Sequence, residues 1–201
     1  MRKTKEEAEI TKQKIMDAAL QLFKNKGFDA TRLQDIAKVT GMTRGAIYWH
    51  FKNKQDILAT LMMDMKKRFE VGLKNYQEEE GGAIEKLRRL VQDIIMAHTA
   101  DQRIQDLFIV MMSNYQISEK LRKGRLKAEF PTQFIDTVGS LIKQGMDEND
   151  IRRDIDPDEI AWLVLILLTG SIITHLKFPD AYEVSIIVDR MLDCFTHGIL
   201  T

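Results

Sequence analysis

The residues from Thr43 to Lys54 carry side chains that suit contact with nucleic acid. Hydroxyl, guanidinium, phenol and imidazole groups lie close together there, on Thr43, Arg44, Tyr48 and His50, and two lysines follow. A guanidinium can hydrogen-bond the major-groove edge of a base. Hydroxyl, phenol and ammonium groups suit phosphate oxygens, which set the register of a protein on DNA without reading its sequence. These residue types therefore predict recognition of DNA.

The segment Leu33–Phe51, which carries these groups, has the spacing of a helix-turn-helix. Ala37 is small where two crossing helices come closest, and Gly41 supplies the positive φ of a tight turn between them. The second helix then begins at Thr43–Ala46, the end that meets base edges. Gly45 costs about 1 kcal/mol inside a helix. We interpret that cost as tolerated because the bare backbone at Gly45 can approach DNA closely.

Helices are expected on both sides of this motif. An apolar stripe predicts a first helix over Lys5–Lys26. Thr31 is predicted as the N-cap of the next helix, with Gln34 completing a capping box. Asn53 is the expected N-cap of a longer helix that runs from Lys54 to about Gln77.

The whole chain is expected to be all-α. It has three prolines, none before Pro131, and no alternating strand pattern. We expect about nine helices, arranged as a three-helix helix-turn-helix domain at residues 1–55 and a helical bundle at residues 56–201. Among the later helices we expect one over Glu119–Met146 that is kinked at Pro131, and two that begin at Pro157 and at Pro179-Asp180.

The charge of the chain is unevenly distributed. Residues 1–55 contain 12 Lys and Arg against 6 Asp and Glu, and the remainder contains 18 against 24, although the net charge of the chain is zero. A basic segment on an acidic body is typical of a polyanion-binding module attached to something larger. A solvated lysine-rich helix face is the alternative that charge alone leaves open.

The run from Thr31 to Leu58, TRLQDIAKVTGMTRGAIYWHFKNKQDIL, resembles the DNA-binding domain of the TetR/AcrR family of transcriptional regulators. Within it TRGAIYWHFKNK, like the opening RKTKEEAE, is similar to the multidrug-efflux repressors of that family. The resemblance covers about the first 60 residues. It implies a repressor of a palindromic operator on double-stranded DNA, released by a small apolar or amphipathic effector, with an efflux system as a candidate target.

The motif and the resemblance together give an expected set of DNA-binding residues. The set is Thr31, Arg32, Thr43, Arg44, Gly45, Ala46, Tyr48, Trp49, His50, Lys52 and Lys54. For Thr31 and Lys54 the expectation includes backbone amides at helix starts, which can face phosphates. An aromatic core cluster is the alternative for Tyr48 and Trp49, and we expect Phe51 to lie in the core.

The resemblance also implies a ligand pocket among the middle helices and a homodimer formed mainly through the last two helices. The expected pocket residues are Met96, His98, Phe108, Met111, Met112, Tyr115 and Phe134, although a plain core stripe accounts equally well for each one. His98 can equally interact with the end of its helix dipole. The expected interface residues are Trp162, Leu163, Ile166, Leu167, Gly170, Ile173, Ile187, Met191 and Phe195.

Other classes of function find little support in the residues. The chain shows no nucleophile–base pair, phosphate-cradling glycine loop or helical metal-ligand pattern, so we expect no enzyme activity, no metal and no cofactor. The apolar run Ile160–Leu176 is interrupted by polar residues and favours a core or interface helix over a membrane span. The N-terminus lacks a signal sequence and Cys194 is the single cysteine, expected as a small buried hydrophobe. From these two features we expect a cytoplasmic protein.

Two alternatives to an effector-controlled regulator stay open. One is a DNA-binding organiser without an effector, which would have a filled core in place of a ligand cavity. The other is a helical enzyme that processes a small apolar molecule, for which the sequence offers no catalytic constellation.

Overall fold

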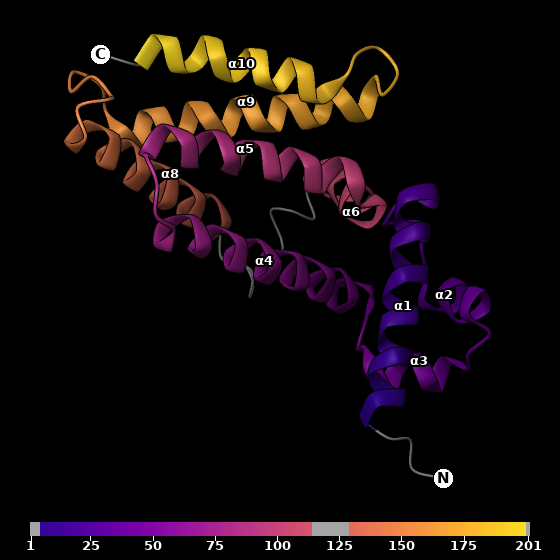
Figure 1. Ribbon diagram of the computed structural model, residues 1–201. Helices are drawn as coiled ribbons and strands as arrows, with labels where there is room; N and C mark the ends of the chain where they lie inside the picture. The colour runs from indigo at the N-terminus through magenta and orange to yellow at the C-terminus, as the bar shows by residue number, and fades with distance from the viewer. Residues whose placement is uncertain (1–4, 114–128, 200–201) are drawn as a thin grey trace. The chain divides into compact units, whose positions relative to one another are not determined.

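A computed structural model of the chain describes residues 5–113 and 129–199 (Figure 1). The regular structure in these ranges is α-helical and contains no strand, which confirms the all-α fold. The helices are α1 (Lys5–Lys26), α2 (Leu33–Thr40), α3 (Arg44–His50), α4 (Lys54–Glu78), α5 (Ala83–Ala100), α6 (Gln102–Ser113), α8 (Glu129–Asp147), α9 (Pro157–Lys177) and α10 (Val184–Ile199).

The chain divides into two compact units. The first unit comprises Met1–Lys66 and Gln102–Lys127, and the second comprises Lys67–Asp101 and Ala128–Thr201. The division falls inside α4 and groups α6 with the N-terminal helices, although α6 follows α5 directly in sequence. These are units of packing, and the functional boundary between residues 55 and 56 stays a prediction.

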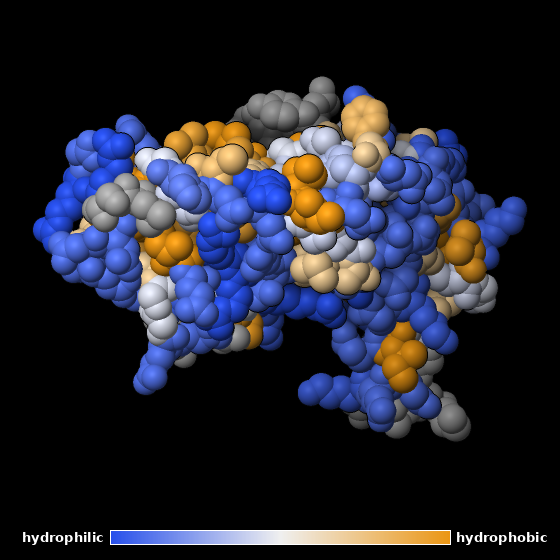
Figure 2. Space-filling model, turned by 45° about the horizontal axis from the view of Figure 1, so that its top comes forward, coloured by the Kyte–Doolittle hydropathy of each residue, from blue (hydrophilic) through white to orange (hydrophobic). Residues whose placement is uncertain are grey.

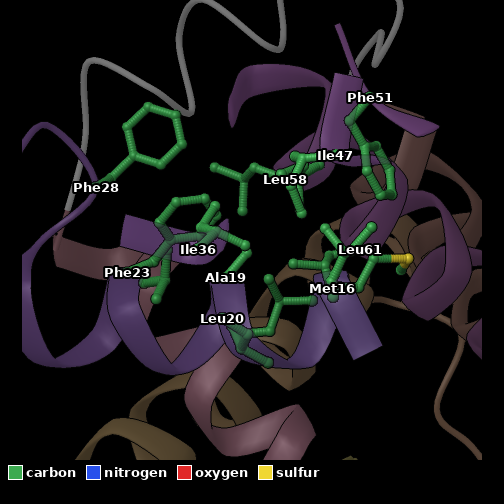
Figure 3. Close-up of a cluster of buried hydrophobic side chains, with 14 of the residues drawn as sticks. Met16, Ala19, Leu20, Phe23, Phe28, Ile36, Ile47, Phe51, Leu58 and Leu61 are labelled. Atoms are coloured by element: carbon green, nitrogen blue, oxygen red, sulfur yellow. The ribbon is translucent and has the colours of Figure 1, made fainter. Parts of the chain in front are cut away.

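The core of the first unit is built around α1. Apolar side chains of α1, α2, α3 and α4 converge in Figure 3, and Leu107 and Val110 of α6 belong to the same buried cluster. Ile36 of α2 and Ile47 of α3 are completely buried in it. Because removal of apolar surface from water stabilises by roughly 25 cal/mol per Å², these side chains fix both helices of the motif on α1.

Local capping shapes the turn between α2 and α3. Gly41 has φ of 67°, and the amide of Met42 donates to the carbonyl of Ala37 at 3.0 Å. Thr43 is the N-cap of α3, and its hydroxyl oxygen accepts a hydrogen bond from the Ala46 amide at 3.2 Å. Asn53 caps α4 by accepting from the Asp56 amide at 2.8 Å. The structure confirms all three assignments made from the sequence.

The cap of α2 differs from the prediction. Arg32, not Thr31, is the N-cap, and Asp35 replaces Gln34 as the residue whose side chain accepts from the N-cap amide, at 3.0 Å. A hydrogen bond from Lys26 and the Arg32 amide both lower the pKa of Asp35. Thr31 is instead buried, and its hydroxyl donates to Gly27 O at 2.7 Å. A carboxylate accepts hydrogen bonds more strongly than a side-chain amide oxygen, which favours Asp35 over Gln34 in this role. The hydroxyl of Thr31 instead donates to carbonyls that are left unpaired at the end of α1.

The second unit is a bundle in which α8 packs on α9, and α5 packs against α8, α9 and α10 (Figure 1). Asp156 caps α9 by accepting from the amides of Asp158 and Glu159, with Pro157 at the first helical position as expected. Arg88 of α5 donates to Asp193 of α10 at 2.7 Å. These contacts join helices that are distant in sequence.

The bounds of two later helices differ from those expected from the sequence. The last helix begins at Val184 instead of at Pro179-Asp180, because these two residues lie in a turn closed by a hydrogen bond from the Ala181 amide to Phe178 O. The helix expected over Glu119–Met146 is described only from Glu129, as α8, and ends at Asp147. Pro131 therefore lies in the first turn of the described helix, and the earlier part of the prediction lies outside the described residues.

Two glycines of the motif should respond oppositely to alanine. Gly41→Ala should lower the free energy of unfolding by about 1 kcal/mol, because the left-handed conformation is strained for an L side chain. Nothing lies within 4 Å of its added methyl group, so crowding does not contribute. Gly45→Ala should raise stability by up to about 1 kcal/mol, since its Cβ would meet only Thr43 Oγ1 at 3.9 Å. Urea unfolding checks both, and equal shifts would contradict this account.

Candidate DNA interface

The short helix α3 presents one face to solvent and buries the other. Ile47 is fully buried and Phe51, directly after the helix, is 2% exposed, as expected for core residues. On the opposite face Tyr48 is 50% exposed and Trp49 is 71% exposed. These exposed fractions exclude the alternative that Tyr48 and Trp49 are ordinary core residues of the first unit.

Polar groups cluster at the two ends of α3. Thr43, Arg44 and Gly45 are exposed at its N-terminal end. At its other end His50 is half-buried, and its ring lies 4.5 Å from that of Trp49 in an edge-on contact. One guanidinium, one phenol and one imidazole therefore share a short exposed helix. A helix of this kind can enter the major groove with its N-terminal residues toward the base edges.

Residues flanking α3 extend the polar surface. Arg32, Asn53 and Lys52 are exposed, while Ala46 is half-buried on α3 itself. The backbone amide of Lys52 donates to Asp56 Oδ2 at 3.0 Å, and the Lys52 side chain is exposed to solvent. Such exposed cations can reach phosphate oxygens by small rotamer changes.

Lys54 has a different place from the one expected. Its ammonium donates to three backbone carbonyls, those of Phe28 at 2.7 Å, Asp29 at 2.8 Å and Thr31 at 3.1 Å. It also lies 4.7 Å from the centre of the Phe28 ring. An ammonium has three protons, so its donors are used inside the protein. Lys54 thus fastens the start of α4 to the turn after α1, and this geometry does not support direct phosphate contact by its side chain.

Thr31 also faces inward. Its side chain is 1% exposed, and its amide donates to Phe28 O at 3.2 Å. Neither group is therefore directed at a DNA ligand. The sequence carried no signal for these two inward roles, because both depend on where the turn after α1 meets the start of α4.

The predicted pocket residues are divided between the two units and differ in their burial. Phe134 of α8 is fully buried, and its ring is 6.2 Å from that of Phe69 in α4. Met96 and Met112 are exposed. Phe108 and Met111 are half-buried on α6, which packs in the first unit, and Tyr115 lies outside the described residues. Their role in ligand contact stays a prediction.

His98 lies at a small hollow within the second unit. The hollow is lined by Ile95, His98, Thr99, Ile172, His175, Leu176 and Val184. Burial lowers the pKa of His98, so its imidazole is neutral near pH 7. In the parts of the chain that the structure describes, no three His, Cys, Asp or Glu side chains are grouped to hold a metal ion.

The predicted dimer residues are all at least partly exposed in the single chain. Six of the nine are exposed, namely Trp162, Leu163, Ile166, Gly170, Ile173 and Ile187, and the other three, Leu167, Met191 and Phe195, are half-buried. Figure 2 shows apolar side chains in orange exposed among hydrophilic ones in blue. Cys194 is exposed as well, so its expected burial is wrong for the single chain.

Helix α9 is long and apolar enough to cross a membrane, the one helix of this kind within residues 5–113 and 129–199. Its most apolar stretch has a mean hydropathy of 1.8, and 28% of that stretch is buried in the chain. Length and composition alone do not distinguish a span from a helix that a second protein surface covers.

Comparison with known proteins settles the family. The profile described as "Bacterial regulatory proteins, tetR family" matches residues 15–61, and the profile described as "Tetracyclin repressor-like, C-terminal domain" matches residues 84–193. The chain belongs to the TetR family of bacterial regulators. The first profile covers the second half of α1, all of α2 and α3 and the start of α4. The second covers α5 from its second residue, α6, α8, α9 and the first part of α10. This TetR-family chain is a DNA-binding transcriptional regulator.

Relatives agree over nearly the full length. The HTH-type transcriptional regulator SrpR of Pseudomonas putida is 43% identical over 179 residues, which cover 89% of this chain and 81% of SrpR. The fold matches NalD, the secondary repressor of the MexAB-OprM multidrug efflux pump in Pseudomonas aeruginosa, with a TM-score of 0.79, 22% identity and 98% of each chain covered. It also matches SmeT in the SmeT–triclosan complex, with a TM-score of 0.80, 21% identity and coverage of 96% and 92%.

Two lysines beside α3 should separate stability from DNA affinity. Lys54→Met should lower the free energy of unfolding by about 2 kcal/mol, because it removes charge-assisted hydrogen bonds to backbone carbonyls. Lys52→Met, the matched control, should leave stability unchanged and weaken binding to all DNA sequences equally. Chemical denaturation and fluorescence anisotropy measure the two effects. Unchanged stability of Lys54→Met would refute its inward role.

Proposed function

We propose that this TetR-family protein is a homodimeric, cytoplasmic repressor that binds a palindromic operator and is released from it by a small apolar or amphipathic effector. The observation that carries the proposal is the exposed face of α3, which a fully buried core holds in place. The family supports DNA binding in general, and the geometry supports particular roles for its side chains.

In this proposal the side chains of α3 divide into two groups. Arg44, exposed at the N-terminal end of α3, reads a base edge in the major groove. Tyr48, His50 and Lys52 contact phosphates and fix the register of α3 on the duplex. Gly45 allows the backbone to come close to the bases, because no side chain stands between them.

The second unit supplies the dimer. Exposed apolar residues of α9 and α10 include Ile166, which is 62% exposed in the single chain. Large exposed apolar patches mark interaction surfaces, and a four-helix arrangement with a second copy would cover this one. Two α3 helices about 34 Å apart would then contact successive major grooves of an inverted repeat.

The proposal for the effector and the target rests on two proteins of similar fold. NalD is named as a repressor of a multidrug efflux pump, and SmeT was solved with triclosan, which favours a small-molecule effector and an efflux target here. A thermal-shift screen with lipophilic cations, fatty acids and drugs tests the effector. A protein without an effector, the organiser alternative, would show no shift with any of them.

Operator binding tests the central proposal. Footprinting on DNA that flanks the coding region should reveal an inverted repeat, and gel shifts should prefer it to scrambled fragments. If a dimer neutralises about 6 to 10 phosphates, log K should fall against log salt with a slope of roughly −5 to −9. Equal binding to repeat and scrambled DNA would overturn the proposal.

Variants of α3 separate base reading from phosphate contact. Arg44→Ala should lose about 1–3 kcal/mol of binding free energy on the operator and much less on random DNA. Tyr48→Phe should weaken binding to both DNAs alike. Gly45→Ala should bind the operator more weakly although it is at least as stable as the parent. Anisotropy titrations on both DNAs measure these effects, and an equal loss for Arg44→Ala on both would assign Arg44 to phosphate.

A charge on the α9 surface tests the dimer. Ile166→Arg should dissociate the protein to monomers, because two guanidinium groups would be buried against an apolar partner surface. It should weaken operator binding at the same time. Val71→Arg, at a similarly exposed apolar position of α4, is the matched control and should stay dimeric. Light scattering that shows an intact Ile166→Arg dimer would remove this surface from the proposal.

A further inference from the structure

Asp106 of α6 is a fully buried carboxylate that the sequence analysis did not single out. Its exposed fraction is 0%, and both oxygens are hydrogen-bonded. Oδ1 accepts from Lys24 Nζ at 2.6 Å and from Gln102 Nε2 at 2.9 Å, and Oδ2 accepts from Gln21 Nε2 at 2.6 Å. Lys24 and Gln21 belong to α1, so one side chain of α6 joins two side chains of α1.

The spacing of the donors makes the cluster a two-helix contact. Gln21 and Lys24 lie three residues apart and share one face of α1, while Gln102 and Asp106 lie four apart on α6. Around them Leu107 and Val110 of α6 join the buried core of the first unit. Apolar contacts are not directional, so by themselves they define the register of two helices less sharply. Hydrogen bonds to a buried carboxylate are directional, and a shift of one helical turn would leave the charge without its partners.

The carboxylate of Asp106 stays ionised in this cluster. Burial by itself raises the pKa of a carboxyl group, but the hydrogen bonds from Lys24, Gln102 and Gln21 outweigh this effect and hold the pKa of Asp106 below its ordinary value. Since the folded-state pKa is depressed, the cluster stabilises the protein fully above the ordinary pKa of aspartate and weakens as pH falls through the depressed value.

We propose that Asp106 is a positioning residue that fixes the register of α6 on α1, so that α6 moves with the DNA-binding unit and its stability is coupled to operator binding. The inference rests on the proposed operator-binding function. It also identifies where the chain passes from one unit to the other. Helix α5, in the second unit, ends at Ala100, and α6 begins at Gln102, with only Asp101 between them. A displacement of α6 would then displace α1 and, through the shared core, α3.

Coupling of this kind is reciprocal, which provides the test. If α6 is held in register by α1, a ligand that orders the first unit must also order α6. Hydrogen exchange of the full-length protein is measured with and without the footprinted operator fragment, with a scrambled fragment as reference. The operator should slow exchange of amides 107–113, which contain no proposed DNA-contact residue. The scrambled fragment should have a smaller effect.

Asp106→Asn should remove that protection and weaken operator affinity by about tenfold, within the usual range of coupling between sites. Arg103→Gln is the matched control, because Arg103 forms a partly exposed ion pair at 3.4 Å with Asp17 across the same two helices. It should leave both readouts unchanged. If Asp106→Asn does not fold, Lys24→Met replaces it, and Lys24→Arg should restore both readouts because it keeps a charged donor.

The outcomes separate this inference from the proposed function. If the parent protein binds the operator but amides 107–113 exchange as in free protein, α6 is not coupled and the inference is wrong. The same holds if Asp106→Asn lowers thermal stability but keeps parental affinity and protection, which is what a purely structural ion pair would do. Failure of the parent protein to recognise any operator would contradict the proposed function itself, and the coupling with it.

Discussion

The structure depends on the burial of a few apolar side chains against α1. The recognition helix α3 has only seven residues, which is too short to be stable by itself in water. It persists because Ile47 and the adjacent Phe51 are anchored in the core, together with Ile36 from α2. The exposed residues that we propose to contact DNA therefore gain their fixed positions from neighbours on the opposite face of the same helix.

Local features of this motif could be predicted from sequence because their causes lie within a few residues. Gly41 at the turn, Thr43 at the start of α3 and Asn53 at the start of α4 each act through backbone groups nearby. The same reasoning failed at Thr31, where two acceptable local solutions competed. A carboxylate at Asp35 displaced the amide of Gln34, and the unsatisfied end of α1 took the threonine.

Features that join distant parts of the chain escaped prediction. Asp106 and Lys24 are 82 residues apart, and Lys54 meets Phe28 across 26 residues, so no spacing rule connects them. The burial of single apolar residues was not predictable for a related reason, because Phe134 and Met96 have similar apolar character yet one is buried and the other exposed. The apolar excess of α9 was visible in sequence, but its exposure in a single chain required the packing of α8 and α5 around it.

The membership of α6 in the first unit also bears on how this family can be recombined. A chimera that joined residues 1–55 of this chain to the remainder of a relative would give α1 a foreign α6, and Gln21 and Lys24 would face whatever residue replaced Asp106. The partly exposed ammonium of Lys24 would then lose its buried carboxylate partner. We therefore expect the exchange of C-terminal domains between such regulators to succeed only where α1 and α6 come from the same parent protein.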